Sequence, residues 1–221
     1  MHELEKTATS KILQVAVSLP KTFLVSGREV STGIFKEKVD GKVPLKTLNL
    51  DGDEQADLTV HGGVDKAVYT YPSEHYPYWQ GEYPKKELEY GIFGENLTTE
   101  NLLETDVCIG DEFQVGTAVI RVSQPRIPCY KLGIRFGRPD IIKRFMKSGR
   151  SGIYFAVVKE GVLEAGDQIV RIKSDPDNIT VSEVASLFNQ RTFDPVRIEK
   201  ILHSRLADQM KMFVSSLVHR G

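Results

Sequence analysis

The chain has 221 residues, which is enough to bury one substantial core with a small appendage. Hydrophobic residues make up 40% and charged residues 27%, an ordinary composition for a globular protein, and the formal charge of −1 gives no general attraction to nucleic acid or an anionic membrane. Two cysteines cannot build a disulfide framework, no apolar run approaches the ~18 residues of a membrane span, and the first ten residues lack the apolar core of a secretory signal. We therefore expect a cytoplasmic protein that is not embedded in a membrane.

The first third of the chain predicts strands joined by turns. Residues 11–19 form an extended apolar run, and turn-like breaks follow at 27–29 and 40–42. The sequence AVYTY at 67–71 is rich in the β-branched and aromatic residues that favour strands. Residues 73–80 suit a short helix that Pro77 would interrupt.

The middle of the chain predicts a barrel. Residues 107–123 alternate in polarity around a Gly-Asp turn at 110–111, and a similar pattern returns at 162–172, so we expect two hairpins of one barrel. Between them, residues 139–149 carry an apolar stripe between a proline and a glycine, which predicts a helix. A buried strand follows at 149–158, GRSGIYFAVV.

The composition changes after Lys173. The turn-rich segment SDPDN comes first, and three amphipathic helices follow it. The first begins with the capping box of Thr180 and Glu183, and the second with Asp194 before a proline. We therefore expect a mainly β body over residues 1–173 and a small three-helix domain over 174–221.

The segment QPRIPCYKLG, residues 124–133, carries the strongest indication of chemistry. It places Cys129 near Arg126 and Lys131, whose charges favour a thiolate, on a backbone that two prolines stiffen. The alternative is a buried cysteine that packs as a small hydrophobe. Cys108 has aliphatic neighbours and no basic one, so we expect it to be structural.

A second motif, HGG at 61–63, precedes Lys66. Gly62 and Gly63 allow backbone N–H groups to approach a ligand, Lys66 adds a positive charge, and His61 adds a titratable donor. Together they suit an anion. A tight turn with a solvated lysine is the simpler interpretation.

Two further segments combine glycine with polar side chains. In GIFGENLT, Glu95 and Asn96 follow a tight glycine turn, although a loop with a capping asparagine explains them equally well. Arg150 and Ser151 lie between two glycines, and a guanidinium on such a backbone suits a phosphate, whereas a helix cap also explains Gly149.

Taken together and in this order, HGGVDKAVY, GIFGENLT, QPRIPCYKLG and GRSGIYFAVV resemble the MOSC domain. The C-terminal helices resemble those of its bacterial subgroup linked to resistance to 6-N-hydroxylaminopurine. The resemblance implies a closed β-barrel similar to the barrel domain of pyruvate kinase. It also implies a molybdenum cofactor (molybdopterin) with Cys129 as metal ligand and catalytic residue, and a reductase of N-hydroxylated small molecules that receives electrons from a flavoprotein. The expected cofactor-binding residues are His61, Gly62, Gly63, Lys66, Glu95, Asn96, Arg126, Arg150 and Ser151.

Three alternatives stay open. A sulfur carrier of the same family would hold a persulfide on Cys129. A cysteine hydrolase would need His61 or His75 as base, but the sequence shows no oxyanion-hole motif. A helix-turn-helix nucleic-acid binder is disfavoured, because residues 181–221 carry six Lys or Arg against four Asp or Glu, too small an excess for phosphate contacts.

Overall fold

The computed structural model describes residues 9–25, 27–54, 62–190 and 192–218. The strands are β1 Ser10–Val17, β2 Lys21–Val25, β3 Arg28–Thr32, β4 Glu37–Val39, β5 Val43–Leu45, β6 Val68–Pro72, β7 Leu97–Glu100, β8 Glu112–Val115, β9 Ala118–Pro125, β10 Ile153–Lys159, β11 Gly161–Leu163 and β12 Gln168–Lys173. The helices are α1 Tyr76–Glu82, α2 Tyr130–Phe136, α3 Ile141–Ser148, α4 Val181–Ser186, α5 Pro195–His203 and α6 Asp208–Val218. Single 3-10 turns occur at η1 Val64–Lys66, η2 Ser73–His75 and η3 Leu187–Asn189.

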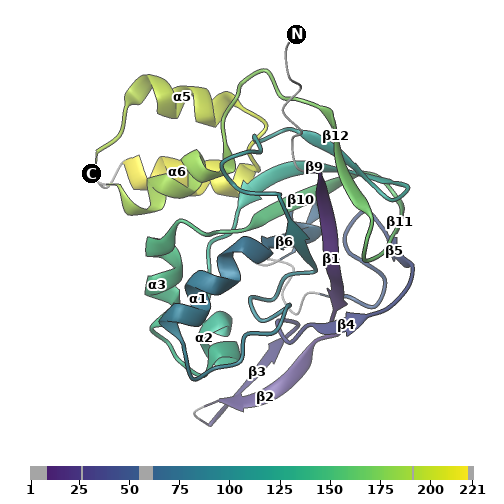
Figure 1. The fold of residues 1–221 in the computed structure, drawn as a ribbon. Helices are drawn as coiled ribbons and strands as arrows, with labels where there is room; N and C mark the ends of the chain where they lie inside the picture. The colour runs from purple at the N-terminus through teal and green to yellow at the C-terminus, as the bar shows by residue number, and fades with distance from the viewer. Residues whose placement is uncertain (1–8, 26, 55–61, 191, 219–221) are drawn as a thin grey trace.

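Seven strands close into a barrel in the order β12-β8-β9-β10-β6-β7-β1, with β1 pairing back onto β12 (Figure 1). The pairs are antiparallel except for β6 and β7, which run parallel. Strand β1 changes register between Ile12 and Gln14, and the bulge there lets it pair with β12 at one end and β4 at the other. The expected mainly β, closed-barrel fold is confirmed.

The barrel interior follows the predicted alternation on β9. Ala118, Ile120 and Val122 are all buried, because alternate residues of a strand point to the same face. The prediction that residues 110–111 form the turn of this hairpin is wrong. The two-residue loop lies instead at Gly116 and the residue after it, since Val115 pairs directly with Ala118.

Helices α1, α2 and α3 lie together on one side of the barrel (Figure 1). They surround a buried aromatic cluster that includes Trp79, Phe93 and Phe145. The expectation that Pro77 would interrupt a helix here is wrong. Pro77 lies in the first turn of α1, where a backbone N–H has no hydrogen-bond acceptor within the helix, so proline is tolerated there.

Helix α2 begins within the segment QPRIPCYKLG, where the sequence did not predict a helix. Leu132 and Phe136 are four residues apart and both buried, and Gly137 ends the helix in the left-handed conformation with φ of 69°. Residues 126–129 are the connection that remains between β9 and α2.

The three C-terminal helices are present, and the first two begin at the predicted N-cap residues. The Thr180 hydroxyl accepts a hydrogen bond from the Glu183 N–H at 3.1 Å, and the Asp194 carboxylate accepts one from the Val196 N–H at 3.0 Å. Their buried residues, including Ile201 and Val214, belong to the same apolar cluster as the barrel interior. The division into 1–173 and 174–221 stays a prediction.

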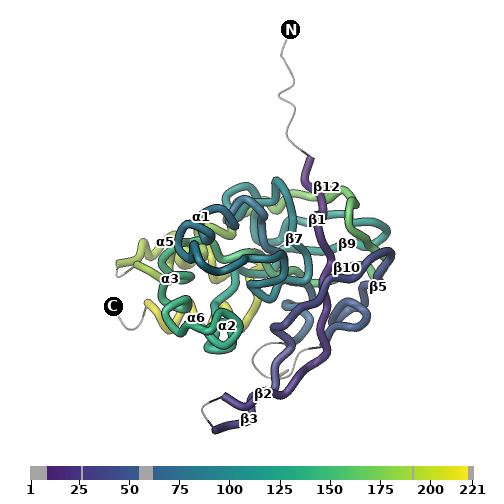
Figure 2. Tube along the Cα trace, turned by 60° about the horizontal axis from the view of Figure 1, so that its bottom comes forward, coloured from purple at the N-terminus to yellow at the C-terminus, as the bar shows by residue number. Residues whose placement is uncertain are grey.

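The β2–β3 hairpin projects from the barrel, and the chain returns from it through residues 33–36 to one end of the barrel (Figure 2). That return brings Lys36 beside residues much later in the sequence. Within the described ranges, the helices are too short or too polar to cross a lipid bilayer.

Candidate functional site

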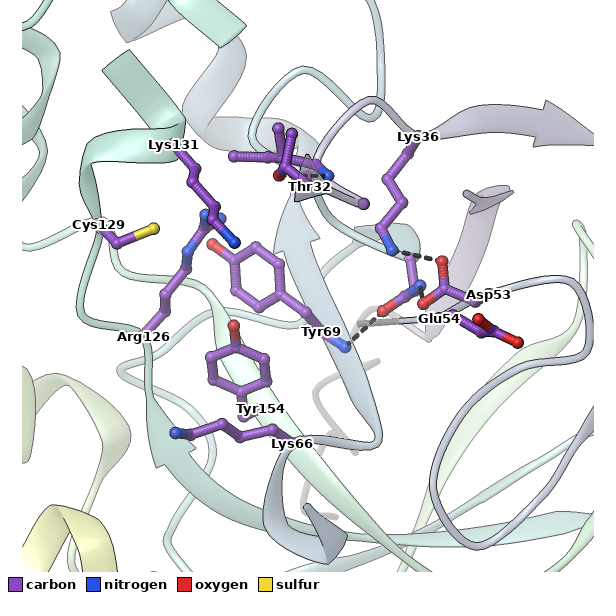
Figure 3. A pocket seen from close by; sticks show the side chains of 14 residues that line it. Thr32, Lys36, Asp53, Glu54, Lys66, Tyr69, Arg126, Cys129, Lys131 and Tyr154 are labelled. Atoms are coloured by element: carbon purple, nitrogen blue, oxygen red, sulfur yellow. Dashed lines mark hydrogen bonds and ion pairs between the residues drawn. The ribbon is translucent and has the colours of Figure 1, made fainter. Parts of the chain in front are cut away.

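Cys129 lies at the end of the barrel where β9 meets α2. It occupies the N-cap of α2 in extended backbone geometry, with φ of −114° and ψ of 172°, and its carbonyl accepts a hydrogen bond from the Leu132 N–H at 3.0 Å. Its side chain is half-buried, and neither it nor Cys108 forms a disulfide. The strand and the helix therefore hold the thiol at the edge of the cavity shown in Figure 3.

This cavity, here named the polar cavity, is bordered by charged side chains from four separate segments of the chain. Its cations are Lys36, Lys66, Arg126 and Lys131, and its carboxylates are Asp53 and Glu54. Tyr69, Asn96 and Tyr154 complete the polar part of the wall. Because Asp53 is paired with Lys36, the surplus charge is positive, and the cavity suits an anionic ligand.

Arg126 is the most deeply fixed of the cations, with 7% of its surface exposed. Its guanidinium donates to the carbonyl of Phe93, in the GIFG turn, and lies 4.6 Å from the centroid of the Tyr69 ring. Burial alone would lower the pKa of Arg126, but its interactions with Tyr69, Tyr154 and Cys129 outweigh burial and raise it. The positive charge near the sulfur is therefore permanent.

A second fixed group in the cavity was not predicted. Lys36 forms a buried ion pair with Asp53, whose carboxylate also accepts hydrogen bonds from the Ser18 N–H at 2.8 Å and the Asn96 side-chain amide at 2.9 Å. The side-chain carbonyl oxygen of Asn96 in turn accepts a hydrogen bond from the Tyr69 backbone N–H at 3.1 Å. Burial lowers the pKa of Lys36, and Asp53 opposes that shift. Asn96 thus reaches the site as predicted, and orders its wall.

Lys66 also reaches the cavity. Its ammonium donates to the Gln209 side chain of α6 at 2.8 Å, and burial lowers its pKa against the opposing effect of Asp65. Gly62 and Gly63 do not line the polar cavity, although Gly63, with φ of 101°, begins the turn that carries Lys66. His61 lies outside the described residues.

Glu95 is buried behind the cavity rather than in it. One carboxylate oxygen accepts hydrogen bonds from the Tyr76 hydroxyl, the Gly91 N–H at 2.8 Å and the Thr98 hydroxyl at 3.2 Å. The other oxygen has no hydrogen-bond partner, and burial raises the pKa of this carboxyl group. Glu95 therefore organises the turn that ends at Gly94, and Gly94 itself lines the cavity.

Arg150 points away from the cavity. Its guanidinium lies 3.9 Å from the centroid of the Tyr78 ring and donates to the Ser148 carbonyl at 3.2 Å. The Ser151 hydroxyl donates to the neighbouring carbonyl of Gly152 at 2.9 Å, while its own carbonyl accepts the Tyr69 hydroxyl at 2.8 Å. Ser151 supports the tyrosine of the wall, and neither residue lines the polar cavity.

The remaining candidates lie elsewhere. The backbone of Cys108 forms an isolated β-bridge with that of Thr180. Burial raises the pKa of the Cys108 thiol, and nearby Asp111 reinforces this effect. His75 pairs with Glu104 at 2.8 Å, and the same carboxylate accepts the Gly152 N–H at 2.6 Å. No histidine is among the described residues that line the cavities beside Cys129, and His75 is paired elsewhere.

Cys129 also lines a second cavity. It shares Lys66, Cys129 and Tyr154 with the polar cavity, and we name it the apolar cavity. The rest of its wall comes from Gln124 on β9, from Ile127 and Pro128, and from Gln209, Met210 and Phe213 of α6. Cys129 is therefore a common wall of two chemically different spaces.

Comparison with known proteins identifies the family of the chain. The sequence profile of the MOSC domain matches residues 57–170. The chain belongs to the MOSC domain family. The uncharacterised protein YflK of Bacillus subtilis is 39% identical over 86% of both chains, and protein YiiM of Escherichia coli is 42% identical over 77% of both. The crystal structure of YiiM from Geobacillus stearothermophilus superposes with a TM-score of 0.80 at 31% identity, and covers 95% of this chain and 99% of that one.

A protein of Gibberella moniliformis named as a reductase is 40% identical over 72% of this chain but over only 28% of its own length. The MOSC match contains Lys66, Arg126 and Cys129. Lys36, Asp53 and helix α6 lie outside it, so two parts of the site come from sequence beyond the matched domain.

Proposed function

We propose that this protein is a molybdenum-cofactor-dependent reductase of N-hydroxylated compounds, with the Cys129 thiolate as the metal ligand. The observation that carries the proposal is the position of the thiol in the wall of a cavity with surplus positive charge, in a chain of the MOSC family. MOSC domains are associated with molybdenum cofactor binding in general, and one relative is named as a reductase. A soft thiolate is a suitable molybdenum ligand.

The residues of the polar cavity fit such a cofactor. Its phosphate requires cationic and N–H donors, and Lys66, Arg126 and Lys131 supply positive charge at different points of the wall. Gly94 lines the cavity where a Cβ would lie 2.7 Å from Ile34, so a side chain there would crowd the wall. Lys36, Asp53 and Asn96 supply a fixed polar face for a hydrogen-bonding pterin.

The overall reaction is a two-electron reduction in which R–NH–OH, two electrons and two protons give R–NH2 and water. The N–O bond breaks, and its oxygen leaves as water. The bound cofactor would supply the two-electron redox chemistry, and a flavoprotein partner would supply the electrons. The chain has to hold the substrate beside Cys129 and provide protons.

Lys66 is the group best placed to hold a proton for the reaction. Its ammonium lies where the two cavities meet, and burial lowers its pKa, which makes it a better proton donor than an exposed lysine. The Gln209 side chain fixes its position at 2.8 Å. Burial raises the pKa values of Tyr69 and Tyr154, so both phenols stay neutral and serve as wall and hydrogen-bonding groups.

The deciding experiment is elemental analysis of protein made in a cofactor-competent host, together with pterin fluorescence. We expect close to one molybdenum per chain and reduction of an N-hydroxylated test compound with a chemical electron donor. Absence of molybdenum, combined with cyanide-releasable sulfur on Cys129, would instead identify the sulfur carrier. The expected cytoplasmic location and the expected absence of nucleic-acid partners remain parts of this proposal.

A further inference from the structure

Helices α2 and α3 carry an excess of positive charge that the polar cavity uses only in part. Residues 130–150 contain seven Lys or Arg and a single carboxylate, although the formal charge of the whole chain is −1. The cations are Lys131, Arg135, Arg138, Lys143, Arg144, Lys147 and Arg150, and the carboxylate is Asp140. This stretch directly follows Cys129, and its first cation lines the polar cavity. The positive charge of the chain is therefore concentrated beside the candidate site.

Only part of this charge is neutralised within the fold. The Asp140 carboxylate pairs with Arg138 and with Arg144, each at 3.0 Å, and Arg144 also pairs with a carboxylate of α1. Lys143 and Lys147 are exposed, and in the described part of the chain neither forms a hydrogen bond or an ion pair. Helix α3 thus presents two unpaired ammonium groups to the solvent.

The positions of these two lysines oppose the stability of α3 itself. Lys143 lies in the first turn, where the partial positive charge of a helix N-terminus disfavours a cation. Lys147 follows four residues later on the same side of the helix, and like charges at that spacing repel each other. Because no described carboxylate pairs with either lysine, a negatively charged partner would relieve a repulsion that the fold leaves in place.

An arginine stacked on a tyrosine lies at the end of the same helix. The Arg150 guanidinium, three residues after Lys147, is 3.9 Å from the centroid of the Tyr78 ring on α1, and Tyr78 is 37% exposed. Helix α1 lies beside α3 (Figure 1), and the rings of Trp79 and Phe145 stack between them with centroids 6.0 Å apart. Arginine and tyrosine are enriched among the residues that dominate binding at protein interfaces. We name the side chains of Lys143, Lys147, Arg150 and Tyr78 the basic surface.

We infer that the basic surface docks an acidic protein, and that this protein is the flavoprotein that supplies electrons in the proposed function. The identity of the partner rests on that function, whereas the surface is assigned from charge and exposure. The reduced flavin of the partner is the reductant and supplies the two electrons of the overall reaction. Because α2 begins beside Cys129 and lies next to α3, a partner docked here contacts the elements that hold the thiol in place (Figure 1). The surplus charge also steers an acidic partner and raises its association rate.

The same charge would attract a lipid surface or a nucleic acid, but the other features of α2 and α3 favour neither. Among the described residues, no large apolar side chain of α3 is exposed, so the helix lacks the anchors that insert into a lipid surface. Nucleic-acid binding commonly engages roughly six to ten phosphates. Fewer cations than this are available, because Arg138 and Arg144 are paired with carboxylates and Lys131 lines the polar cavity.

Binding is measured by calorimetry with the full-length protein and, as the probe, a purified flavodoxin with an acidic surface. We expect the affinity to fall as salt rises from about 0.05 to 0.5 M, because salt screens exposed charges. Lys143→Glu combined with Lys147→Glu should raise Kd about tenfold or more at low salt, and Arg150→Ala about three- to tenfold. Lys42→Glu combined with Lys159→Glu is the control of equal charge. Both control lysines are exposed and lie at the ends of β5 and β10, away from α3, so Kd should stay at the wild-type value (Figure 1).

Activity then separates the surface from the site. With reduced flavodoxin as the electron donor, the variant with both Lys143→Glu and Lys147→Glu should lose about tenfold or more in kcat/KM for the donor. Its molybdenum content and its turnover with reduced methyl viologen, a small chemical donor, should not fall. Wild-type Kd and kcat/KM for flavodoxin in this variant and in Arg150→Ala would overturn the inference while the proposed function stands.

Two further outcomes decide between the proposals. If the wild-type protein holds no molybdenum but binds flavodoxin, and the lysine variant weakens that binding, the docking surface stands and the reductase proposal fails. If the protein instead binds a single-stranded RNA oligonucleotide or vesicles of anionic phospholipid more tightly than flavodoxin, and the lysine variant abolishes that binding, the basic surface is not a protein-docking surface and the inference is overturned.

Discussion

The chemistry of a thiol depends on its surroundings, and the two cysteines of this chain have opposite surroundings. Cys129 lies beside Arg126 and Lys131 in the wall of two cavities. Cys108 lies beside Asp111, which together with burial raises the pKa of its thiol, and its sulfur points to the Asn178 side chain at 3.8 Å. The thiolate is the form that binds metals, so the surroundings favour Cys129 for that role.

Cys129→Ser is therefore expected to reduce activity to the background rate, because a hydroxyl is a far weaker acid and a harder ligand than a thiol. Molybdenum content and turnover of an N-hydroxylated substrate measure the effect. Cys108→Ser is the control and should keep both at wild-type values, with at most a modest loss of stability. Loss of activity in a folded Cys108→Ser variant would contradict the assignment.

The cations of the polar cavity should differ from Arg150 in their effect on cofactor retention. Removing one charged hydrogen-bonding partner from a binding site costs roughly 1.5–3 kcal/mol, or about ten- to a hundredfold in affinity. We expect Lys66→Ala and Lys131→Ala to show such losses when cofactor is titrated into the apo variants. Arg150→Ala, whose guanidinium stacks on Tyr78, should retain wild-type affinity. The reverse result would place the anionic end of the cofactor near Arg150.

Glu95 allows a prediction about pH. Burial raises the pKa of this carboxyl above its ordinary 4.5, so the folded chain binds more protons than the unfolded chain between pH 4.5 and the raised value. This group therefore makes stability fall as pH rises through that window. The side chain of the Glu95→Gln variant cannot ionise. The free energy of unfolding of this variant, relative to that of the wild type, should therefore increase as pH rises through the window. Parallel urea titrations across the pH range measure the difference, and a constant difference would contradict the raised pKa.

At the scale of elements, the sequence predicted what local pattern determines. The alternation on β9 and the caps of α4 and α5 were correct, because strand faces and helix starts depend on residues within a few positions of one another. Helix α2 was missed, because its buried apolar residues, Leu132 and Phe136, pack against an aromatic cluster whose other members lie far away in the sequence.

In the site too, residues that stand in short motifs were predicted, and contacts that depend on the fold were not. Cys129, Lys66 and Arg126 stand in short motifs and were predicted, and all three line the polar cavity. The ion pair of Lys36 and Asp53 joins residues 17 positions apart, with β4 and β5 between them, and no local pattern marks it. Arg150 looked suited to phosphate, but the left-handed Gly149 turns the chain so that the guanidinium meets Tyr78 instead.

The GIFG turn carries a prediction at this scale. Gly94 has φ of 79°, and an added Cβ would lie 2.7 Å from the Ile34 side chain, whereas Gly41 has φ of 78° with no atom within 4 Å of its Cβ position. Gly41→Ala should cost about 1–2 kcal/mol from left-handed backbone strain alone. Gly94→Ala should cost more, because the clash with Ile34 adds to the same strain. Thermal unfolding compares them, and equal losses would show that Ile34 moves aside freely.

At the scale of the whole molecule, the helices after Lys173 share their buried surface with the barrel. The segment before α4 is joined to the barrel by backbone hydrogen bonds from the Ile109 N–H to Ile179 at 2.8 Å and from the Val181 N–H to Val107 at 3.0 Å. Val181, Ile201 and Val214 continue the barrel's apolar cluster. Helix α6 also lines the apolar cavity. Met210 of α6 belongs both to the wall of this cavity and to the apolar cluster of the barrel.

This shared core predicts how the chain unfolds. Trp79 is the single tryptophan and is fully buried on α1, so its fluorescence reports on an aromatic cluster that includes no described residue of α6. Val214 on α6 is fully buried, whereas Val196 on α5 is 76% exposed. Val214→Ala should cost about 2 kcal/mol, which lowers the unfolding temperature by roughly 4–8 °C in a protein of this size. Val196→Ala should change it little.

If barrel and helices unfold as one unit, Val214→Ala will shift the Trp79 fluorescence transition by the same amount as the far-ultraviolet circular dichroism transition. A domain that folds independently over residues 174–221 would behave differently. The circular dichroism of the helices would then be lost at lower temperature, while the Trp79 transition stayed at its wild-type midpoint. Because the buried side of α6 continues the barrel core, we expect the two transitions to coincide, and a truncation after Lys173 to lose the stability that this common surface provides.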